Sequence, residues 1–226
     1  MTALILQARL DSTRLPEKSL LPLGGRPMIF RVMEALAFFP SEVKILACPE
    51  DCVSAFSPLA EEVGFTLVSG PKDDVLARYC LALRQSGADR VVRATADNPF
   101  VFVDAAAALN REAISLGADY AGYSGLPYGA GVESIASAAL LRAEKEATLD
   151  GERQHVCPFL YGHPELFLLH RPLAPFSWQS PEMRITMDTR EDYERAQALY
   201  RRLSVLPPNE RNLGENVIAA FKGMNE

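Results

Sequence analysis

The chain has 226 residues and a formal net charge of -6, and apolar residues make up 48% of it. This length suits one α/β domain with a full hydrophobic core, and the composition is that of an ordinary globular protein. The acidic balance argues against a general nucleic-acid or membrane-surface binder, because both need a basic footprint. No stretch approaches the roughly 18 apolar residues of a membrane span.

The N-terminus enters an apolar run directly, without the charged region and cleavage site of a secretory leader. We therefore expect a cytoplasmic location. The four cysteines, Cys48, Cys52, Cys80 and Cys157, are then expected to be reduced and mostly buried thiols. Cys48 and Cys52 have no second pair or histidine at zinc-finger spacing, which argues against a structural zinc site.

Strands and helices alternate along the first half of the chain, with short connections. Apolar runs predict four strands, at residues 3–7, 43–47, 65–68 and 89–94. The segments that follow these strands predict four helices, at residues 27–39, 49–63, 75–86 and 103–116. Pro27 suits a first helical position, and Gly64 suits a helix end. This alternation predicts an α/β fold with a doubly wound, mostly parallel sheet.

The second half of the chain is less regular. Glycines at 122, 125, 129 and 131 predict a flexible loop around Pro127. Short strands are expected at residues 119–121, 132–135, 166–170 and 184–187. Helices are expected at residues 137–147, 151–161, 190–203 and 210–221.

The first predicted strand is followed by a polar segment that is basic in an otherwise acidic chain. Arg9, Arg14 and Lys18 lie within ten residues of one another. They follow the carboxyl end of a buried strand, which is where open α/β sheets place their ligands. Guanidinium and ammonium groups can share the charge of a polyanion, and a triphosphate fits this pattern. The alternative is a solvated basic loop.

Two aspartates follow predicted strands later in the chain. Asp97 lies in the run RATADNP, and Asp188 lies in the run RITMDTREDY. From position alone, Asp97 is equally consistent with a turn or helix-cap aspartate, and Asp188 indicates a strand end followed by a helix cap. Asp192 suits the first turn of a helix, where the helix dipole favours negative charge.

These segments carry a resemblance to a known family. The run ARLDSTRLPEK at 8–18, followed by LGGRPM at 23–28, resembles the N-terminal signature of the sugar-acid cytidylyltransferases. It is most similar to the SpsF-like branch, which is related to CMP-Kdo synthetases and acylneuraminate cytidylyltransferases. Further segments resemble the family in the same order: RATADNP, RITMDTREDY, GPKDDVLARY at 70–79, YGAGVE at 128–133 and RQHV at 153–156.

The resemblance implies a Rossmann-like nucleotide-diphospho-sugar transferase fold, with a small β-containing insertion for acceptor binding and dimerisation. Within a single domain at 1–226, residues 1–118 would form the nucleotide-binding half. Residues 119–188 would form the acceptor and dimerisation part, and 189–226 the C-terminal helices.

The resemblance also implies roles for single residues. Arg14 and Lys18 would bind the β- and γ-phosphates and, with Asp97, form the catalytic set, while Asp97 and Asp188 would bind Mg²⁺. Backbone groups near Gln7 and Ala8 would read the base. Nucleotide contacts are expected from Gln7, Ala8, Arg9, Ser12, Gly70, Asp74 and Arg78. Acceptor contacts are expected from Tyr128, Glu133, Arg153 and His155.

For some of these residues the sequence leaves a structural alternative open. Asp74 is equally suited to cap a helix, and Arg78 to lie on a solvated helix face. A lone histidine such as His155 is often structural. Glu17 departs from the glycine that is common at its place in the family, and an anion there would weaken the field that attracts phosphates.

The function implied is an Mg²⁺-dependent cytidylyltransferase of surface polysaccharide biosynthesis. The anomeric hydroxyl of a sugar acid would attack the α-phosphate of CTP, and pyrophosphate would leave. Relatives are commonly homodimers, and we expect a homodimer on that basis, with no nucleic-acid or membrane partner. The acceptor sugar is left open.

Three alternatives are left open: a nucleotidyltransferase with another nucleotide or acceptor, a glycosyltransferase of related fold, and, from a different class, a silent nucleotide-binding protein. The GGRP turn at 24–27 recurs in relatives that use other nucleotides with neutral sugar phosphates or pterin cofactors. A glycosyltransferase of related fold usually has an Asp-x-Asp metal motif, where this chain has Asp97-Asn98-Pro99. A catalytically silent nucleotide-binding protein would not need Arg14, Lys18 and the two aspartates together.

Overall fold

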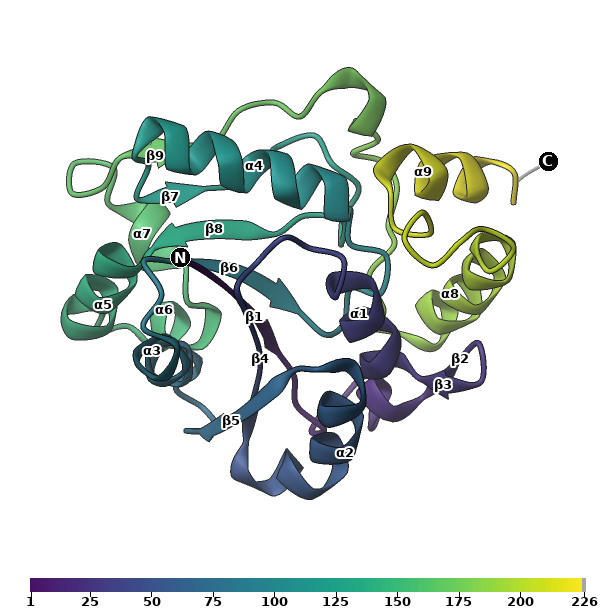
Figure 1. Cartoon of the computed structure of the whole chain (residues 1–226), viewed down its shortest axis with the longest axis horizontal. Helices are drawn as coiled ribbons and strands as arrows, with labels where there is room; N and C mark the ends of the chain where they lie inside the picture. The colour runs from purple at the N-terminus through teal and green to yellow at the C-terminus, as the bar shows by residue number, and fades with distance from the viewer. Residues whose placement is uncertain (225–226) are drawn as a thin grey trace.

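A seven-stranded sheet forms the centre of the computed structural model, which describes residues 1–224 (Figure 1). The strand order is β5-β4-β1-β6-β8-β7-β9. The strands are β1 (Thr2–Gln7), β4 (Val43–Pro49), β5 (Thr66–Gly70), β6 (Arg90–Thr95), β7 (Tyr120–Ala121), β8 (Glu133–Ala136) and β9 (Leu169–His170). The first four run parallel, and β8 is antiparallel to both β6 and β7. The predicted α/β fold with a mostly parallel sheet is confirmed.

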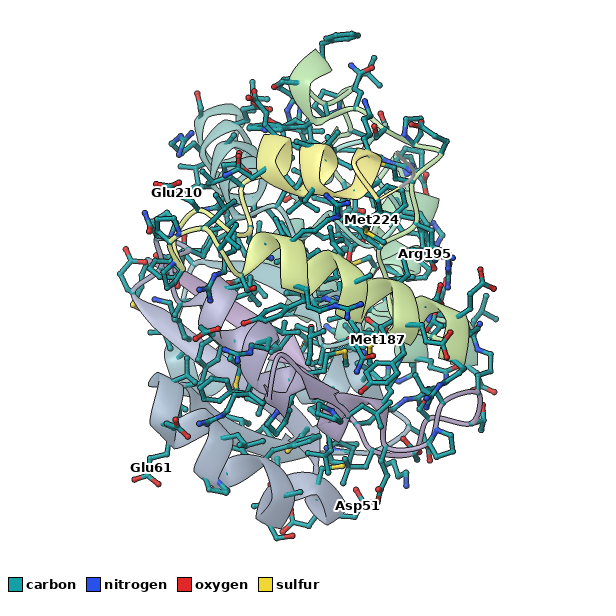
Figure 2. The ribbon with its side chains drawn as sticks, turned by 90° about the vertical axis from the view of Figure 1, so that its right-hand side faces the viewer. Asp51, Glu61, Met187, Arg195, Glu210 and Met224 are labelled. Atoms are coloured by element: carbon teal, nitrogen blue, oxygen red, sulfur yellow. The ribbon has the colours of Figure 1, made fainter. Side chains whose placement is uncertain are left out.

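Helices cover both faces of this sheet (Figure 1). The helices are α1 (Met28–Leu36), α2 (Val53–Val63), α3 (Val75–Ser86), α4 (Val103–Leu116), α5 (Ser137–Glu146), α6 (Asp150–His155), α7 (Pro158–Gly162), α8 (Arg190–Leu203) and α9 (Gly214–Lys222). Short 3-10 turns are η1 (Lys18–Leu20), η2 (Glu50–Cys52) and η3 (Phe176–Trp178), and β2 (Pro22–Leu23) pairs with β3 (Arg26–Pro27) in a hairpin. Figure 2 looks onto α8 and α9, which lie side by side on one flank of the molecule.

The apolar run that opens the chain is buried on both faces of the sheet. Leu4 and Leu6 belong to the core beneath α1, α2, α4 and α8, whereas Ala3 and Ile5 belong to the core beneath α3 and α5. All four side chains are fully buried. A strand covered on both faces needs a continuous apolar run, as this segment has. Its polar continuation, from Gln7 onward, therefore emerges at the edge where parallel strands end.

Two elements differ from those predicted. The expected helix at 151–161 is broken, because Val156 has a positive φ of 71° and Pro158 lacks the N–H that would continue the helix. Residues 184–187 join no strand of the sheet, since they bond instead to the neighbouring loop, with the Ile185 N–H donating to the Tyr128 carbonyl at 2.9 Å. The other predicted strands and helices are present with bounds that shift, as for the last helix, which begins at Gly214. The β2–β3 hairpin and the 3-10 turns were not predicted.

The glycine-rich segment is held close to residues 184–187. A Cβ at Gly129 would lie 2.6 Å from the backbone nitrogen of Thr186, and Gly129 has a φ of 101°. Only glycine fits such a close approach at this φ. This contact brings the 125–131 loop and the segment before α8 to the same end of the sheet.

The four cysteines are free and buried, as predicted. Burial raises the pKa of the Cys48 and Cys80 thiols to about 12 and that of Cys52 to about 11. They are therefore protonated and unreactive near neutral pH. None of the helices within residues 1–224 is both long enough and apolar enough to span a membrane.

Candidate active site

A cavity of about 470 Å³ opens at the carboxyl ends of β1 and β6. Its walls come from the segment after β1, the turn after β6, the end of α6 and the residues before α8. Most of the predicted site residues line it: Gln7, Ala8, Arg9, Ser12, Arg14, Lys18, Asp97, Tyr128, His155 and Asp188. The structure thus brings together residues that lie up to 181 positions apart in the chain, from Gln7 to Asp188.

The segment after β1 turns back on itself before η1. The Ser19 hydroxyl donates to the Arg9 carbonyl at 3.1 Å, which closes this loop. Glu17, just before η1, has a left-handed backbone with a φ of 51°. Only glycine adopts this conformation without strain, which gives a physical reason for the glycine at this place in the family. The turn directs the side chain of Lys18 into the cavity.

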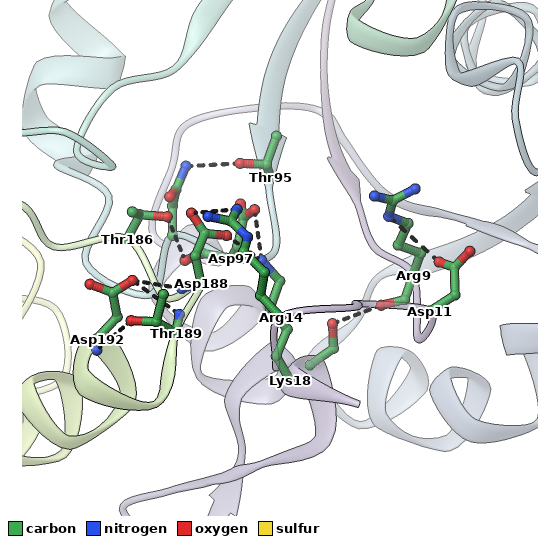
Figure 3. Close-up of polar contacts among 12 residues, drawn as sticks. Arg9, Asp11, Arg14, Lys18, Thr95, Asp97, Thr186, Asp188, Thr189 and Asp192 are labelled. Atoms are coloured by element: carbon green, nitrogen blue, oxygen red, sulfur yellow. Dashed lines mark hydrogen bonds and ion pairs between the residues drawn. The ribbon is translucent and has the colours of Figure 1, made fainter. Parts of the chain in front are cut away.

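Lys18 lies between the two aspartates predicted to bind metal (Figure 3). Its Nζ is 3.1 Å from Asp97 Oδ2 and 2.8 Å from Asp188 Oδ1, and its side chain is only 13% exposed. Arg184 and Arg14 contact the other oxygen of Asp188, at 2.9 and 3.4 Å. Burial raises the pKa of Asp188, but the hydrogen bond and charge of Lys18 outweigh it, so the pKa is lowered. Asp188 is therefore ionised near neutral pH.

Backbone contacts join the two aspartate segments. The Met187 N–H donates to the Asp97 carbonyl at 2.8 Å, and the Thr186 hydroxyl donates to the same oxygen at 3.3 Å. Asp97 and Asp188 are consequently held at a set separation by the main chain.

Asp192 anchors the start of α8 beneath this cluster (Figure 3). Its carboxylate accepts from the N–H groups of Asp188 and Thr189, both at 3.1 Å, and Thr189 caps the helix in return. Arg184 and Arg195 also bond to it. Asp192 is a first-turn helix residue, as predicted, and its contacts fix the backbone position of Asp188.

The two carboxylates suit a hard divalent cation. Their oxygens already reach one ammonium, so a single cation between them can contact both. Mg²⁺ prefers oxygen ligands and is usually held by one or two carboxylates plus substrate phosphates and water. Across residues 1–224, no cluster of three or more His, Cys, Asp or Glu side chains is placed to hold a metal. The donor set fits Mg²⁺ only in company with a phosphate ligand.

A second cavity, of about 280 Å³, adjoins the first. The two share Arg93, Thr95 and Asn98, at the end of β6 and in the turn that follows. Glu133, a predicted acceptor contact, lines this smaller cavity, whereas Tyr128 and His155 line the larger one. The smaller cavity also has Arg171 and several hydroxyl groups in its wall. The predicted acceptor residues are thus divided between two connected spaces.

Four predicted contact residues lie outside both cavities: Gly70, Asp74, Arg78 and Arg153. Asp74 caps α3 by accepting from the Ala77 N–H at 2.9 Å, so the helix-cap alternative describes its position. Its other oxygen accepts two hydrogen bonds from Arg153, at 2.5 and 2.7 Å. The Arg153 guanidinium therefore faces Asp74, and not an acceptor carboxylate.

Arg78 is buried, which corrects the alternative of a solvated helix face. It donates to the carbonyls of Pro71 and Lys72, at 2.5 and 3.2 Å. A Cβ at Gly70 would contact the Arg78 side chain at 3.1 Å. Arg78 thus holds the loop before α3, and Val75 is the residue from this region that reaches the larger cavity.

The cavities also contain residues to which the sequence assigned no role: Arg93, Thr95, Asn98, Gln154 and Arg171, of which all but Arg171 lie within the quoted motifs. Arg93 carried a usable signal, because a charged side chain inside a buried apolar strand needs a partner. Arg171 follows a two-residue strand and carried no signal of this kind.

A family model described as cytidylyltransferase matches residues 3–215. The spore coat polysaccharide biosynthesis protein SpsF of Bacillus subtilis (strain 168) is 29% identical over 211 residues, which cover 90% of this chain and 88% of that protein. A 3-deoxy-manno-octulosonate cytidylyltransferase of Leptothrix cholodnii is 34% identical over 110 residues, or 46% of this chain and 41% of that protein. These matches confirm the resemblance drawn from the motifs.

Solved structures show the same fold. A cytidylyltransferase from Leptospira borgpetersenii matches with a TM-score of 0.89 at 22% identity, over 99% of this chain and 94% of that one. A CMP:2-keto-3-deoxy-manno-octonic acid synthetase complexed with CTP matches with a TM-score of 0.68 at 14% identity, over 88% of this chain and 97% of that one.

Proposed function

The chain belongs to the cytidylyltransferase family, and we propose that it transfers CMP from CTP to a sugar acid, with Mg²⁺ as cofactor and pyrophosphate as the second product. The observation that carries this proposal is the convergence of Asp97, Asp188 and Lys18 at the end of the sheet. The relatives' names support the nucleotide and the acceptor class, because they include a cytidylyltransferase of 3-deoxy-manno-octulosonate and a synthetase complexed with CTP.

The larger cavity is the proposed nucleotide site. Arg9, Ser12 and Arg14 line it on the side of the β1–η1 segment. The Arg14 side chain is 65% exposed, so it is free to contact the departing pyrophosphate. Lys18 can exchange its carboxylate partners for phosphate oxygens, since its ammonium has three donors and a flexible stem.

Asp97 and Asp188 would hold Mg²⁺, which when bound neutralises phosphate charge in a reaction of this class. Direct attack by the acceptor hydroxyl on the α-phosphate needs no enzyme nucleophile. The four thiols are buried and protonated, which agrees with a reaction that forms no covalent enzyme intermediate. The protein's contribution is then to orient the two substrates and stabilise the leaving group.

The smaller cavity is the proposed acceptor site. It opens into the nucleotide cavity at Thr95 and Asn98, so an acceptor hydroxyl there would face the nucleotide. Its wall combines side-chain hydroxyl groups with the guanidinium of Arg171, a chemistry that suits a polyhydroxylated acid. Tyr128 and His155, which line the nucleotide cavity, are proposed to contact the acceptor from there.

The match to SpsF supports a role in surface polysaccharide biosynthesis, which we propose together with a cytoplasmic location and a homodimer. Leu168, Leu173 and Phe176 leave 55%, 64% and 90% of their surfaces exposed, just before and after the edge strand β9. Such a run of exposed apolar side chains beside a sheet edge supports a contact between two copies. Light scattering of the native protein and of Phe176→Ser tests this, with a shift to monomer expected in the variant.

Turnover assays test the reaction itself. Pyrophosphate release is measured with CTP, UTP, GTP and ATP, in the presence of Mg²⁺ and a panel of sugar acids and sugar phosphates. Release is expected with CTP and a sugar acid, and it should be lost in Asp97→Asn. Asp150→Asn, which changes an exposed aspartate outside both cavities, is the matched control. Release with another nucleotide, or with sugar phosphates alone, would contradict the assignment.

A further inference from the structure

Four side chains form a hydrogen-bonded chain that connects the two cavities. They come from four neighbouring strands of the sheet: Gln7 on β1, Arg93 on β6, Glu133 on β8 and Tyr120 on β7. The Tyr120 hydroxyl donates to Glu133 Oε1 at 2.9 Å, and Arg93 bonds to Glu133 Oε2. The second amino group of Arg93 donates to Gln7 Oε1 at 3.2 Å. Tyr120 and Glu133 line the smaller cavity, Gln7 lines the larger one, and Arg93 lines both.

Each hydrogen bond in this chain has a fixed direction. A guanidinium has five donors and no acceptor, so the atom of Gln7 that faces Arg93 must be the amide oxygen. The amide nitrogen, with its two N–H donors, is then turned away from Arg93. Burial lowers the pKa of Arg93, but the charge of Glu133 outweighs it and the pKa is raised, so Arg93 stays a cation. The polarity of the Gln7 amide is therefore set by its neighbour.

The backbone at this wall is largely occupied. The Ala8 N–H donates to the Ala47 carbonyl at 3.1 Å, and the Gln7 carbonyl accepts from the Ala96 N–H at 2.9 Å. Both groups were expected to read the base, yet they are bonded within the sheet and the turn after it. Within residues 1–224 the amide nitrogen of Gln7 has no hydrogen-bond partner, so its donors can reach a ligand in the larger cavity.

We propose that the amide nitrogen of Gln7 selects the nucleotide base, and that Arg93 is the positioning residue that presents it. The inference rests on the proposed function and identifies which side chain reads the nucleotide. A group that only donates hydrogen bonds fits cytosine, whose O2 and N3 are adjacent acceptors. Uracil has an N–H at position 3, which would face the amide N–H groups and leave donors unpaired. The arrangement favours CTP over UTP.

Gln7→Glu tests the amide nitrogen of Gln7, because a glutamate side chain has almost the same shape as a glutamine side chain. One carboxylate oxygen still faces Arg93, while the other replaces the donor nitrogen with an acceptor. Dissociation constants are measured for CTP, UTP and tripolyphosphate with Mg²⁺ by titration calorimetry. We expect the preference for CTP over UTP to fall about tenfold or more, in line with the discrimination that a matched base contact supplies. Tripolyphosphate reports the effect of the added charge on the phosphate subsite alone.

Gln154→Glu is the matched control, because Gln154 lines the same cavity from α6 and the change adds the same charge. It should leave the ratio of CTP to UTP affinity within about twofold of the native value, since it alters the field and not the base contact. An equal loss of preference in this variant would overturn the assignment of the base contact to Gln7.

The double variant Arg93→Met with Glu133→Leu tests the positioning role. Removing both charges avoids leaving one buried and unpaired, which a single change would do. The Gln7 amide is then free to present either end to the cavity. We expect the preference for CTP over UTP to fall several-fold while tripolyphosphate affinity is kept. Retention of the full preference would overturn the role of Arg93, and Gln7→Glu tests the base contact independently if this variant does not fold.

The outcomes separate the inference from the proposed function. If the native protein releases pyrophosphate from CTP but Gln7→Glu keeps the native CTP preference, the inference is overturned and the function stands. If the native protein binds no nucleotide, or binds UTP as well as CTP, the inference is overturned together with the choice of CTP.

Discussion

Asp188 and Asp192 lie four residues apart at the start of α8, yet their surroundings differ in kind. Asp188 faces the cavity, where its partners are Lys18, the largely exposed Arg14 and Arg184, which it shares with Asp192. Asp192 is 4% exposed and is bonded to two backbone N–H groups and to Arg184 and Arg195. Two cationic partners of Asp188, Arg14 and Lys18, lie on the segment after β1 and can exchange it for a ligand. The carboxylate of Asp192 bonds instead to the main chain at the start of α8, to Arg195 within the helix and to Arg184 just before it.

This difference distinguishes a residue proposed to act in the reaction, Asp188, from one that stabilises the start of α8, Asp192. A carboxylate whose partners are side chains on a loop can release them to a metal or a phosphate. A carboxylate bonded to main-chain donors cannot do so without unfolding the helix start. We therefore expect substitutions at Asp188 to affect turnover, and those at Asp192 to affect stability.

The largest effect is expected for Asp188→Asn. Loss of a proposed metal ligand should lower kcat roughly 1,000-fold, which corresponds to about 4 kcal/mol of transition-state stabilisation. The free energy of unfolding should change by only about 1 kcal/mol, because Lys18 keeps Asp97 as a partner. Steady-state kinetics and urea denaturation check the two values, and a large loss of stability with modest loss of turnover would reverse the comparison.

Lys18→Met removes the cation between the two carboxylates. We expect kcat/KM for CTP to fall roughly 100-fold, because a phosphate contact is lost. The same change should strengthen the binding of Mn²⁺ in the absence of nucleotide, since the ammonium no longer competes for Asp97 and Asp188. Electron paramagnetic resonance of free Mn²⁺ measures this, and weaker Mn²⁺ binding in the variant would contradict the account.

Asp192→Ala should mainly destabilise the protein. It removes one of the two carboxylates bonded to Arg184 and the half of the capping box that bonds the Thr189 N–H, so the free energy of unfolding should fall by about 3 kcal/mol. Residual turnover should exceed that of Asp188→Asn at a temperature where both variants are folded. Circular dichroism during urea denaturation supplies the stability, and an unchanged midpoint would contradict the structural role.

The contribution of Asp192 should also depend on pH. Burial raises its pKa, but the hydrogen bonds from Arg184 and the main chain outweigh burial and hold the pKa well below its usual range. A depressed carboxyl pKa stabilises the fold above the unfolded value of about 4, and this stabilisation is lost as pH falls through the folded pKa. The stability difference between the native protein and Asp192→Ala should therefore shrink below about pH 4. Urea denaturation at neutral and acid pH measures it, and a constant difference would contradict the charge-based account.

The smallest effect is expected for Glu17→Gly. Glycine adopts the left-handed backbone at this position without strain, so stability should rise by about 1 kcal/mol. Removing the carboxylate should also tighten CTP binding modestly. Thermal unfolding and calorimetry check both values, with Glu50→Gly as a control at a position whose backbone is not left-handed. A loss of stability in Glu17→Gly would contradict the strain argument.

The sequence predicts the first half of the fold well, because the strands there are continuous apolar runs and the helices have caps. Its predictions weaken after residue 119, where strands are two to four residues long and the contacts are between loops. The break at Val156 could not be predicted, because a valine with a positive φ follows from tertiary packing and not from local propensity.

The candidate site shows the same limit. The loop cations and the two aspartates were predicted because each follows a strand and each occurs in a motif. The engagement of Arg153 with Asp74 could not be predicted, since it joins the start of α3 to α6 across 79 positions. The chain from Tyr120 to Gln7 likewise depends on the strand order, which local sequence does not specify.

The central claim is that Asp97 and Asp188 together bind the metal that accompanies CTP. Titration calorimetry of CTP with and without Mg²⁺ tests it directly, in the native protein, Asp97→Asn, Asp188→Asn and the control Asp150→Asn. We expect Mg²⁺ to tighten CTP binding at least about tenfold in the native protein and the control, and to have little effect in either cavity variant. Full Mg²⁺ dependence in Asp97→Asn and Asp188→Asn would contradict the claim.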